Sequence, residues 1–286
     1  MIPSIPQSRS FKVTYTAYVA LFFIFLAMPL AVVAVFAFND SLFPSLPWNG
    51  FTLDWFFNAS DPKRGIFHDR ELMESIGVSM YVAVWVTVLS VLVGTINAFL
   101  FEREEFPFKN FLFVLMLTPL VIPGVILGIS ILIFSTSIIN VSDAWFGYEP
   151  DFLRPGITLV ILGQFSFITT ICTLVISSCL RKFDTTLEEA AWNLGATRWE
   201  AIHTITLPYL RPAIIGAAIV SFLMSFENFN TTLMLVGSDA PLTITMFTRL
   251  RDGSTPALNA VSLLLMVVSS ILVLISIFVQ RERTHN

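Results

Sequence analysis

The chain has 286 residues, of which 55% are hydrophobic and 13% are charged, whereas about 25% of the residues in an average soluble protein are charged. Two cysteines exclude a disulfide-rich scaffold, and a formal net charge of −4 is too small to indicate nucleic acid or another polyion as a partner. The composition predicts a membrane protein.

Six apolar stretches are long enough to cross a bilayer, because a spanning helix needs about 20 apolar residues. Glu227, in the fifth stretch, is the only Asp, Glu, Lys or Arg within them. Lipid offers no hydrogen-bond partner to backbone groups, so such stretches form helices. The sequence therefore predicts an all-α membrane protein with one transmembrane domain over residues 1–286. The six predicted spans cover about residues 14–38, 76–100, 111–134, 156–180, 213–236 and 259–279.

The first stretch, 14–38, follows Arg9 and Lys12, a pattern that also begins secretory signal peptides. Its apolar run is longer than the apolar region of a signal peptide, and no clean small-residue cleavage site follows it. We therefore interpret it as an uncleaved membrane span.

Pro119, Pro123, Gly124 and Gly128 interrupt the third stretch. Proline removes a helical hydrogen bond, and within a membrane such interruptions are tolerated where the backbone lines a cavity or packs against protein. The sequence predicts a bent or broken helix here. Both a place beside a transport path and close packing on a neighbouring helix remain open.

Four polar or thiol side chains of the second and fourth stretches indicate packing rather than chemistry. Asn97 and Gln164 are single amides in apolar surroundings, and we expect them to join neighbouring spans by hydrogen bonds. Cys172 and Cys179 are seven residues apart, which is about 10 Å along a helix and too far for a disulfide bond within it. We predict that both are buried as small hydrophobic residues, rather than serving in redox chemistry or metal binding.

Basic residues are denser in alternate loops, which indicates the orientation, because Lys and Arg are enriched on the cytoplasmic side of membrane proteins. Ten of the 16 lie in the two tails and in the second and fourth loops. We therefore place both termini and the loop 181–212 in the cytoplasm. The ten are Arg9, Lys12, Arg103, Lys109, Arg181, Lys182, Arg198, Arg211, Arg281 and Arg283.

The loop 181–212 is predicted to form two short helices joined at a glycine. The T-x-x-E pattern of a capping box occurs at 186–189 and again at 197–200, so each helix has a defined start. Gly195 can end the first helix in a left-handed turn, and the second helix runs towards Pro208. We expect a rigid element suited to transmitting movement.

Two other interpretations of this loop exist. Short amphipathic helices often only pack at a membrane surface, and that interpretation remains open. Two helices about a glycine also resemble a DNA-reading helix-turn-helix. A loop tethered at both ends to membrane spans, with four basic and four acidic residues, makes a poor reader of DNA, so we predict no nucleic-acid partner.

Seven residues of the loop resemble the EAA motif of binding-protein-dependent ABC importer permeases, at the spacing of that family. The resemblance implies a six-helix membrane protein whose two-helix cytoplasmic loop, between the fourth and fifth spans, docks on a separate ATPase subunit. ATP and Mg²⁺ would be bound by the ATPase subunits, with no cofactor in this chain. Glu189 would offer a charge to the ATPase, and the two alanines after it would permit close approach. The seven residues are Glu189, Ala190, Ala191, Gly195, Ile205, Leu207 and Pro208.

Three further segments resemble the spermidine/putrescine-type permeases. They are 48–55 (WNGFTLDW), 118–124 (TPLVIPG) and 256–260 (PALNA). This resemblance implies a bacterial inner-membrane protein that pairs with a second, non-identical permease subunit. It also implies that an external solute-binding protein delivers a small-molecule solute.

Glu227 is the strongest candidate for contact with the solute. An ionisable residue at membrane depth faces the bundle interior or water, and is a functional candidate for that reason. In a continuous helix, Glu227, Asn230 and Thr231 would share one face, with Asn228 beside them. We predict that these four residues line the solute path, with interhelical hydrogen bonding as the alternative.

The sequence departs from the polyamine pattern at two positions. Polyamine-type permeases tend to carry acids where Gly124 and Asn228 stand here. With Glu227 as the remaining carboxylate, a polyamine-like solute, another small cation, a zwitterion or another small polar organic solute fits the sequence.

No motif for catalysis or metal binding is found. The chain has no G-x-x-x-x-G-K-S/T loop, and His68, His203 and His285 lie in separate segments without neighbours at metal-ligand spacing. We therefore predict neither enzyme activity nor a metal site in this chain. The alternative to an importer permease is an ion-coupled secondary transporter that uses Glu227 as its coupling carboxylate.

Overall fold

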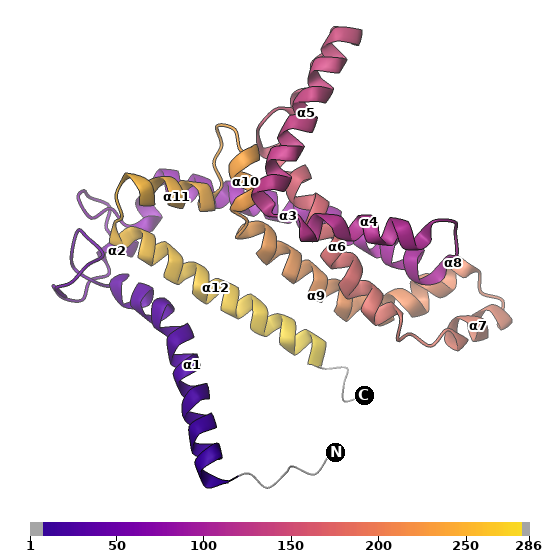
Figure 1. The fold of residues 1–286 in the computed structure, drawn as a ribbon, viewed down its shortest axis with the longest axis horizontal. Coiled ribbons are helices and arrows are strands. Elements are labelled where there is room, and N and C mark those ends of the chain that lie inside the picture. Colours follow the sequence, from indigo (N-terminus) through magenta and orange to yellow (C-terminus); the bar gives the residue numbers. More distant parts are fainter. Residues whose placement is uncertain (1–7, 282–286) are drawn as a thin grey trace. The chain divides into compact units, whose positions relative to one another are not determined.

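The computed structural model describes residues 8–281, which are mostly helical (Figure 1). Six of the described helical runs are long and apolar enough to cross a bilayer, which confirms the predicted all-α fold. These runs are Arg9–Phe36, Arg70–Arg103, Gly124–Phe146, Ile157–Leu180, Arg198–Phe226 and Pro256–Ile275. In chain order the helices are α1 Arg9–Phe36, α2 Asp54–Phe57, η1 Ile66–His68, α3 Arg70–Arg103, α4 Lys109–Val121, α5 Gly124–Phe146, η2 Asp151–Leu153, α6 Ile157–Leu180, α7 Thr186–Asn193, α8 Arg198–Ala201, η3 Ile202–Thr206, α9 Leu207–Phe226, α10 Asn230–Leu235, α11 Leu242–Asp252 and α12 Pro256–Arg281.

By their contacts, the described residues divide into two units. The first lies within Met1–Arg70 and Arg249–Val267, and the second lies within Glu71–Thr248 and Val268–Asn286. The second unit holds both the predicted loop and the predicted solute path. The chain ends, with Arg283, lie outside the described residues, so the orientation of the termini stays a prediction.

The predicted third span, 111–134, is wrong as a single helix. Helix α4 ends before Ile122, and α5 starts after Pro123. The ring of Pro123 disfavours the helical conformation in the residue before it, and Ile122 is extended, with φ of −75° and ψ of 129°. The predicted interruption is therefore confirmed, and the helix with the length of a span is α5.

The predicted fifth span, 213–236, is also broken. Helix α9 ends at Phe226, and the chain leaves the helix at Glu227 and Asn228 before α10 begins. Asparagine side chains compete with the backbone for hydrogen bonds, which disfavours a continuous helix. Here Asn228 Oδ1 accepts a hydrogen bond from the backbone N–H of Thr232 at 3.2 Å. The break thus lies at the one charged residue of the predicted spans.

The predicted second short helix of the loop does not end near Pro208. Instead α8, η3 and α9 form one helical run of 29 residues, Arg198–Phe226. The middle part, η3, is a π-helix in which the Leu207 N–H bonds to the carbonyl of Ile202. Pro208 accounts for this wider turn, because it has no N–H for the carbonyl of Thr204 and its ring crowds that carbonyl. The loop therefore consists of α7 and the extended start of the fifth span.

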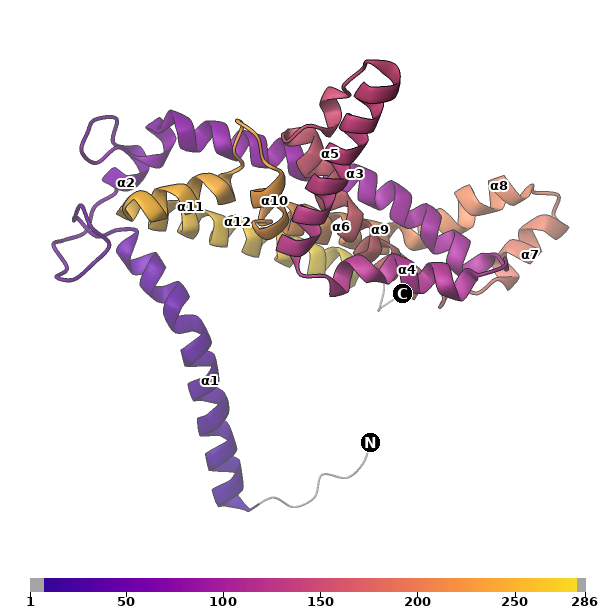
Figure 2. The ribbon, with the colours of Figure 1, turned by 45° about the horizontal axis from the view of Figure 1, so that its top comes forward.

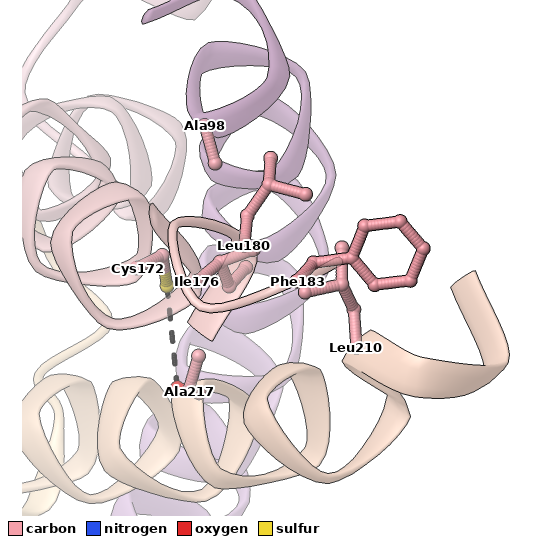
Figure 3. Close-up of a cluster of buried hydrophobic side chains, with 7 residues drawn as sticks. All are labelled: Ala98, Cys172, Ile176, Leu180, Phe183, Leu210 and Ala217. Carbon is pink, nitrogen blue, oxygen red and sulfur yellow. Dashed lines mark hydrogen bonds between the residues drawn. The ribbon is translucent and has the colours of Figure 1, made fainter. Parts of the chain in front are cut away.

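Helix α6 is central in the second unit, and more of its apolar window is buried than in any other of the six candidate spans. Figure 3 shows a group of buried side chains around it, here called the Cys172 cluster. The thiol of Cys172 points towards α9, with Sγ 4.0 Å from the carbonyl oxygen of Ala217. Neither cysteine forms a disulfide bond, and Cys172 is buried as predicted, whereas Cys179 is only half-buried. The cluster consists of Ala98, Cys172, Ile176, Leu180, Phe183, Leu210 and Ala217.

A second group, the Leu235 cluster, packs α10 against α3 and α6. Figures 1 and 2 both show α10 beside α5, while α7 and α8 lie beyond the opposite end of α9. The loop and the helix break are thus at the two ends of the same long helix. The Leu235 cluster consists of Val82, Val86, Leu159, Val160, Ile168 and Leu235.

Candidate functional site

Helix α7 starts differently from the prediction. Its N-cap is Thr185, which makes no capping hydrogen bond with its side chain, so the predicted capping box of Thr186 with Glu189 is wrong. Instead Asp184 Oδ1 accepts hydrogen bonds from the Thr186 hydroxyl at 2.8 Å and from the Thr186 backbone N–H at 3.0 Å. These two bonds favour the ionised carboxylate and lower the pKa of Asp184. Asp184 therefore holds the start of α7.

The turn between α7 and α8 agrees with the prediction. Gly195 ends α7 with a φ of +93°, and the Ala196 N–H bonds back to the carbonyl of Ala191 at 3.0 Å. Thr197 and Glu200 form the predicted capping box. The Thr197 N–H donates to Glu200 Oε2 at 2.7 Å, and the Glu200 N–H donates to Thr197 Oγ1 at 3.3 Å. The turn is thereby fixed on both sides.

The seven motif residues divide into an exposed part and a half-buried part. The exposed motif residues are accessible at the surface, whereas the half-buried ones are partly covered by this chain. Ile205, in η3, packs against the Cys172 cluster. The exposed residues are Glu189, Ala190, Gly195 and Pro208, and the half-buried ones are Ala191, Ile205 and Leu207.

Apolar side chains surround the exposed part of α7. Leu187, Leu194 and Trp199 are exposed, Leu194 with 91% of its surface. The guanidinium of Arg198 lies 5.7 Å from the ring centre of Trp192, which connects α8 to α7. Exposed apolar groups that are gathered beside charged ones are typical of a protein interface. This end of the molecule therefore presents a mixed acidic and apolar surface.

Glu188 was not singled out by the sequence pattern, yet it is the one buried side chain of α7. Its Oε1 accepts a hydrogen bond from the Thr206 hydroxyl and lies 3.4 Å from Nη2 of Arg103. Glu188 and Glu189 are adjacent in the sequence, and a helix turns them about 100° apart. The sequence spacing alone does not show which of the two glutamates faces the protein interior, because this depends on where the neighbouring helices lie.

Glu227 lies at the end of α9, where its backbone N–H bonds to the carbonyl of Leu223. Its side chain is exposed, and Ser269 of α12 donates a hydrogen bond to Oε1 at 3.3 Å. Among residues 8–275, whose side chains the structure describes, no Lys or Arg forms an ion pair with Glu227. A carboxylate in that situation can bind a cationic group of a ligand.

A chain of polar contacts holds the helix break. Asn228 Oδ1 accepts from the Thr232 hydroxyl at 2.9 Å, and Thr232 accepts from Gln164 Nε2 at 2.9 Å. Ser225, at the other side of the break, donates to Gln164 Oε1. Gln164 therefore connects α6 to both α9 and α10, which confirms that this amide joins spans.

Asn230 and Thr231 lie against the start of α5. Thr231 is buried, and its hydroxyl donates to the carbonyl of Gly124 at 3.3 Å. A Cβ atom added to Gly124 would stand 3.0 Å from the Cβ of Asn230, and one added to Gly128 would stand 2.9 Å from the Cβ of Met234. Of the two interpretations of these glycines, the structure supports close packing of α5 on α10.

The predicted common face of Glu227, Asn230 and Thr231 is wrong, because the helix breaks between the first residue and the other two. Glu227 is in contact with α12, and Thr231 is in contact with α5. Asn230 stays exposed, and Asn228 is half-buried. The prediction of a common face assumed that the helix continues without a break through all of these residues.

The polar groups at this break are hydrogen-bonding groups. A carboxylate, amides and hydroxyls can accept and donate hydrogen bonds to a polar solute, and none of them is paired with an activating base. In the part of the chain that the structure describes, no three His, Cys, Asp or Glu side chains come together as metal ligands.

Residues 86–282 match the family described as "binding-protein-dependent transport system inner membrane component". This segment includes the loop and the helix break. The chain is similar to the putrescine transport system permease protein PotI of Escherichia coli (strain K12), with 29% identity over 246 residues, 85% of this chain and 82% of the relative. It is also similar to the spermidine/putrescine transport system permease protein PotC of the same strain, with 24% identity over 265 residues, 91% of each chain.

Two solved structures share the fold. One is a bacterial ABC transporter involved in the import of the acidic polysaccharide alginate, with a TM-score of 0.73, 18% identity and 96% coverage of each chain. The other is a bacterial alginate ABC transporter in complex with an alginate pentasaccharide-bound periplasmic protein. Its TM-score is 0.72 at 16% identity, with 95% of this chain and 94% of that chain covered.

Proposed function

Because the chain belongs to the family of binding-protein-dependent transport system inner membrane components, we propose that it forms part of the membrane path of an ATP-driven importer for a small polar organic solute. The chain is a multi-pass ABC permease subunit of the inner membrane. Separate ATPase subunits bind ATP and Mg²⁺ and hydrolyse the ATP. The permease domain spans the length of this chain and alternates between access to the two sides.

The exposed face of α7 is the observation that carries this proposal. Glu189 and Ala190 are exposed there beside the apolar side chains of Leu187 and Leu194, on a helix with both ends fixed. A rigid, partly apolar protrusion suits a groove in another protein. We assign the seven motif residues to contact with the ATPase, and we place α7 on the cytoplasmic side together with both termini.

The break at the end of α9 is the proposed contact with the solute. Interrupted helices at membrane depth are tolerated where the backbone lines a cavity or is buried in protein. Glu227 and Asn230 are exposed there, whereas Thr231 is buried and Asn228 half-buried. In this proposal Glu227 and Asn230 meet the solute, and Asn228 and Thr231 hold the backbone that presents them.

The solute is proposed to be polyamine-like or another small cation or zwitterion. The two named relatives transport putrescine or spermidine. In this chain the Glu227 carboxylate provides one anionic contact. At Gly124, where polyamine-type permeases tend to carry an acid, α10 packs so closely that it occupies the space of a side chain. One carboxylate with amides and hydroxyls suits a solute with a single cationic end as well as it suits a diamine.

Two further partners complete the proposed assembly. An external solute-binding protein delivers the solute, as the periplasmic protein of the second alginate structure suggests. A second permease subunit, not identical to this chain, supplies the other half of the path. An ion-coupled secondary transporter is not favoured, because the family works with binding proteins and ATPases.

The test of the proposal is a pair of variants at the α7 surface, Glu189→Lys and Gly195→Trp. The complex with its ATPase, the second permease and the binding protein is placed in liposomes, and uptake of radiolabelled putrescine and ATP hydrolysis are measured together. We expect both variants to insert in the membrane but to lose ATP-driven uptake. Asp239→Lys makes the same charge change on an exposed residue outside the loop, and should leave uptake intact. Normal uptake in both loop variants would exclude docking through α7.

A further inference from the structure

Helix α7 is attached to the membrane helices by a carboxylate instead of an apolar face. Glu188 is 7% exposed and is the one buried side chain of this eight-residue helix. The other α7 side chains are exposed or half-buried. The position of α7 relative to the spans therefore depends on what Glu188 contacts.

Glu188 contacts two different spans through the same oxygen atom. Oε1 accepts a hydrogen bond from the hydroxyl of Thr206, at the end of the π-helix that leads into α9. Oε1 also lies 3.4 Å from Nη2 of Arg103, the last residue of α3. Both partners are themselves shielded, since Thr206 is buried and Arg103 is 22% exposed in its side chain. One side chain of α7 thus joins the ends of the second and fifth spans.

These contacts rest directly on the buried core. The guanidinium of Arg103 lies over the ring of Phe183, 5.3 Å from its centre, and Phe183 belongs to the Cys172 cluster. Phe183 in turn packs edge-on against Tyr209 of α9 at 5.0 Å between ring centres. Figure 3 shows Phe183 beside Leu180 and Leu210, between α6 and α9. Arg103, Phe183, Glu188 and Thr206 are called the Glu188 anchor below.

We propose that Glu188 is a positioning residue that transmits the displacement of α7 to α3 and α9, so that movement of the ATPase reaches the solute path through the Glu188 anchor. This inference rests on the proposed function, in which α7 docks on an ATPase. Docking is the role of the outer face of α7 with Glu189, and transmission is the role of the inner face with Glu188.

A buried carboxylate suits this role for a physical reason. An apolar contact can slide, whereas a buried charge loses its compensation as soon as its partners move away. Glu188 therefore keeps α7 at one defined position on α3 and α9 until a large displacement separates them. A helix that occupies one of a few defined positions moves as a unit, so its displacement is transmitted to the helices it contacts instead of being absorbed by small local shifts.

The first experiment needs no solute. Hydrogen exchange of the α7 backbone amides is measured in the purified complex for the wild type, Glu188→Ala and Thr206→Val. We expect exchange in α7 to rise about tenfold or more in Glu188→Ala, because Arg103 and Thr206 lose their acceptor and α7 is released. Thr206→Val removes a single hydroxyl and should give a smaller rise, which covers the case in which Glu188→Ala does not fold.

Arg181→Gln is the matched control. Arg181 forms a bidentate ion pair with Glu102, at 2.6 and 3.1 Å, and so joins the same end of α3 to the end of α6 without touching α7. Its loss should leave the exchange of α7 unchanged. Arg103→Ala combined with Glu188→Ala should raise exchange no further than Glu188→Ala alone, since the two residues act as one pair.

The second experiment measures uptake of radiolabelled putrescine per ATP hydrolysed in liposomes. Glu188→Ala should keep its ATPase subunits through purification but take up several-fold less putrescine per ATP than the wild type and Arg181→Gln. Unchanged α7 exchange, unchanged uptake per ATP, or loss of the ATPase subunits from Glu188→Ala would each overturn the proposed transmission. Failure of the wild-type chain to bind an ATPase would instead overturn the proposed function, and hydrogen exchange measured on the purified chain alone would still report on the anchor.

Discussion

Gln164 Nε2 on α6 donates a hydrogen bond to Thr232 Oγ1 on α10 across 2.9 Å, between residues that lie 68 positions apart in the chain. Its Oε1 accepts from Ser225 on α9, so this buried amide bridges the break between α9 and α10. The break is therefore held by specific hydrogen bonds, and its geometry can be tested by removing them.

Gln164→Leu should lower the thermal stability of the chain. Leucine has a similar volume but leaves two buried hydroxyls without their amide partner, which costs about 1–2 kcal/mol for such groups. Thermal unfolding of the purified protein in detergent measures the effect. Ser178→Ala, which removes an exposed hydroxyl of the same helix, should change little. Equal melting temperatures for the two variants would mean that the bridge contributes nothing.

Gly128→Ala should destabilise the packing of α5 on α10. An added Cβ would stand 2.9 Å from the Cβ of Met234 and 3.0 Å from the carbonyl oxygen of Thr231, so the helices must separate, at a cost of about 1–3 kcal/mol. Gly77, near the start of α3, has nothing within 4 Å of an added Cβ. Gly77→Ala should therefore be neutral or stabilising by up to about 1 kcal/mol from helix propensity. Thermal unfolding of both variants gives the comparison, and a loss of stability at Gly77 as large as at Gly128 would contradict it.

Glu227→Gln should impair transport in an assembled complex. A hydrogen bond to a charged group contributes about 1.5–3 kcal/mol, so we expect the apparent affinity for a cationic solute to fall about tenfold or more. The measurement is uptake of radiolabelled putrescine at several concentrations. Ser269→Ala removes the hydroxyl that donates to Glu227 and keeps the charge, so its effect should be smaller. Unchanged uptake in Glu227→Gln would assign this carboxylate to structure alone.

The pKa of Asp184 depends on Thr186, and this can be tested by titration. The folded state lowers the pKa of Asp184, so its contribution to the stability of α7 is present above the pKa of the unfolded chain and is lost as the pH falls through the folded-state pKa. Thr186→Val removes the hydroxyl donor and should raise the pKa of Asp184 towards its ordinary value. Carboxyl resonances of labelled aspartate in lipid nanodiscs report the change.

A control for this titration lies in the same loop. Thr204 donates its hydroxyl to the carbonyl of Glu200, away from Asp184. Thr204→Val should leave the pKa of Asp184 where it is. An equal pKa of Asp184 in the wild type and in Thr186→Val would show that the Thr186 hydroxyl does not stabilise the carboxylate.

The length of an apolar stretch was enough to predict a helix where charged residues or glycines mark the ends of that stretch. The stretch 156–180 corresponds to α6, Ile157–Leu180, because polar or glycine residues border it on both sides. Hydropathy did not locate the breaks in the third and fifth stretches, since apolar residues continue across Ile122 and on both sides of Glu227. There, proline geometry and side-chain competition for hydrogen bonds decide where the helix stops.

The loop was predictable where local chemistry determines it, and not where tertiary contacts do. The capping box of Thr197 with Glu200 and the turn at Gly195 depend on residues within a few positions of each other. The choice between Glu188 and Glu189 as the inner residue depends on Arg103, 85 positions away in the chain. No local pattern carries that information.

The uninterrupted run from Arg198 to Phe226 has a geometric consequence for Glu227. At a rise of about 1.5 Å per residue, its 29 residues extend roughly 43 Å, so the exposed end beside α7 and the end that carries Glu227 belong to one rod. The π-turn of η3 holds one residue more than an α-helical turn, which rotates all that follows by about 100° around the rod axis. The direction in which the Glu227 carboxylate points from the helix axis therefore depends on η3, which lies at the opposite end of α9.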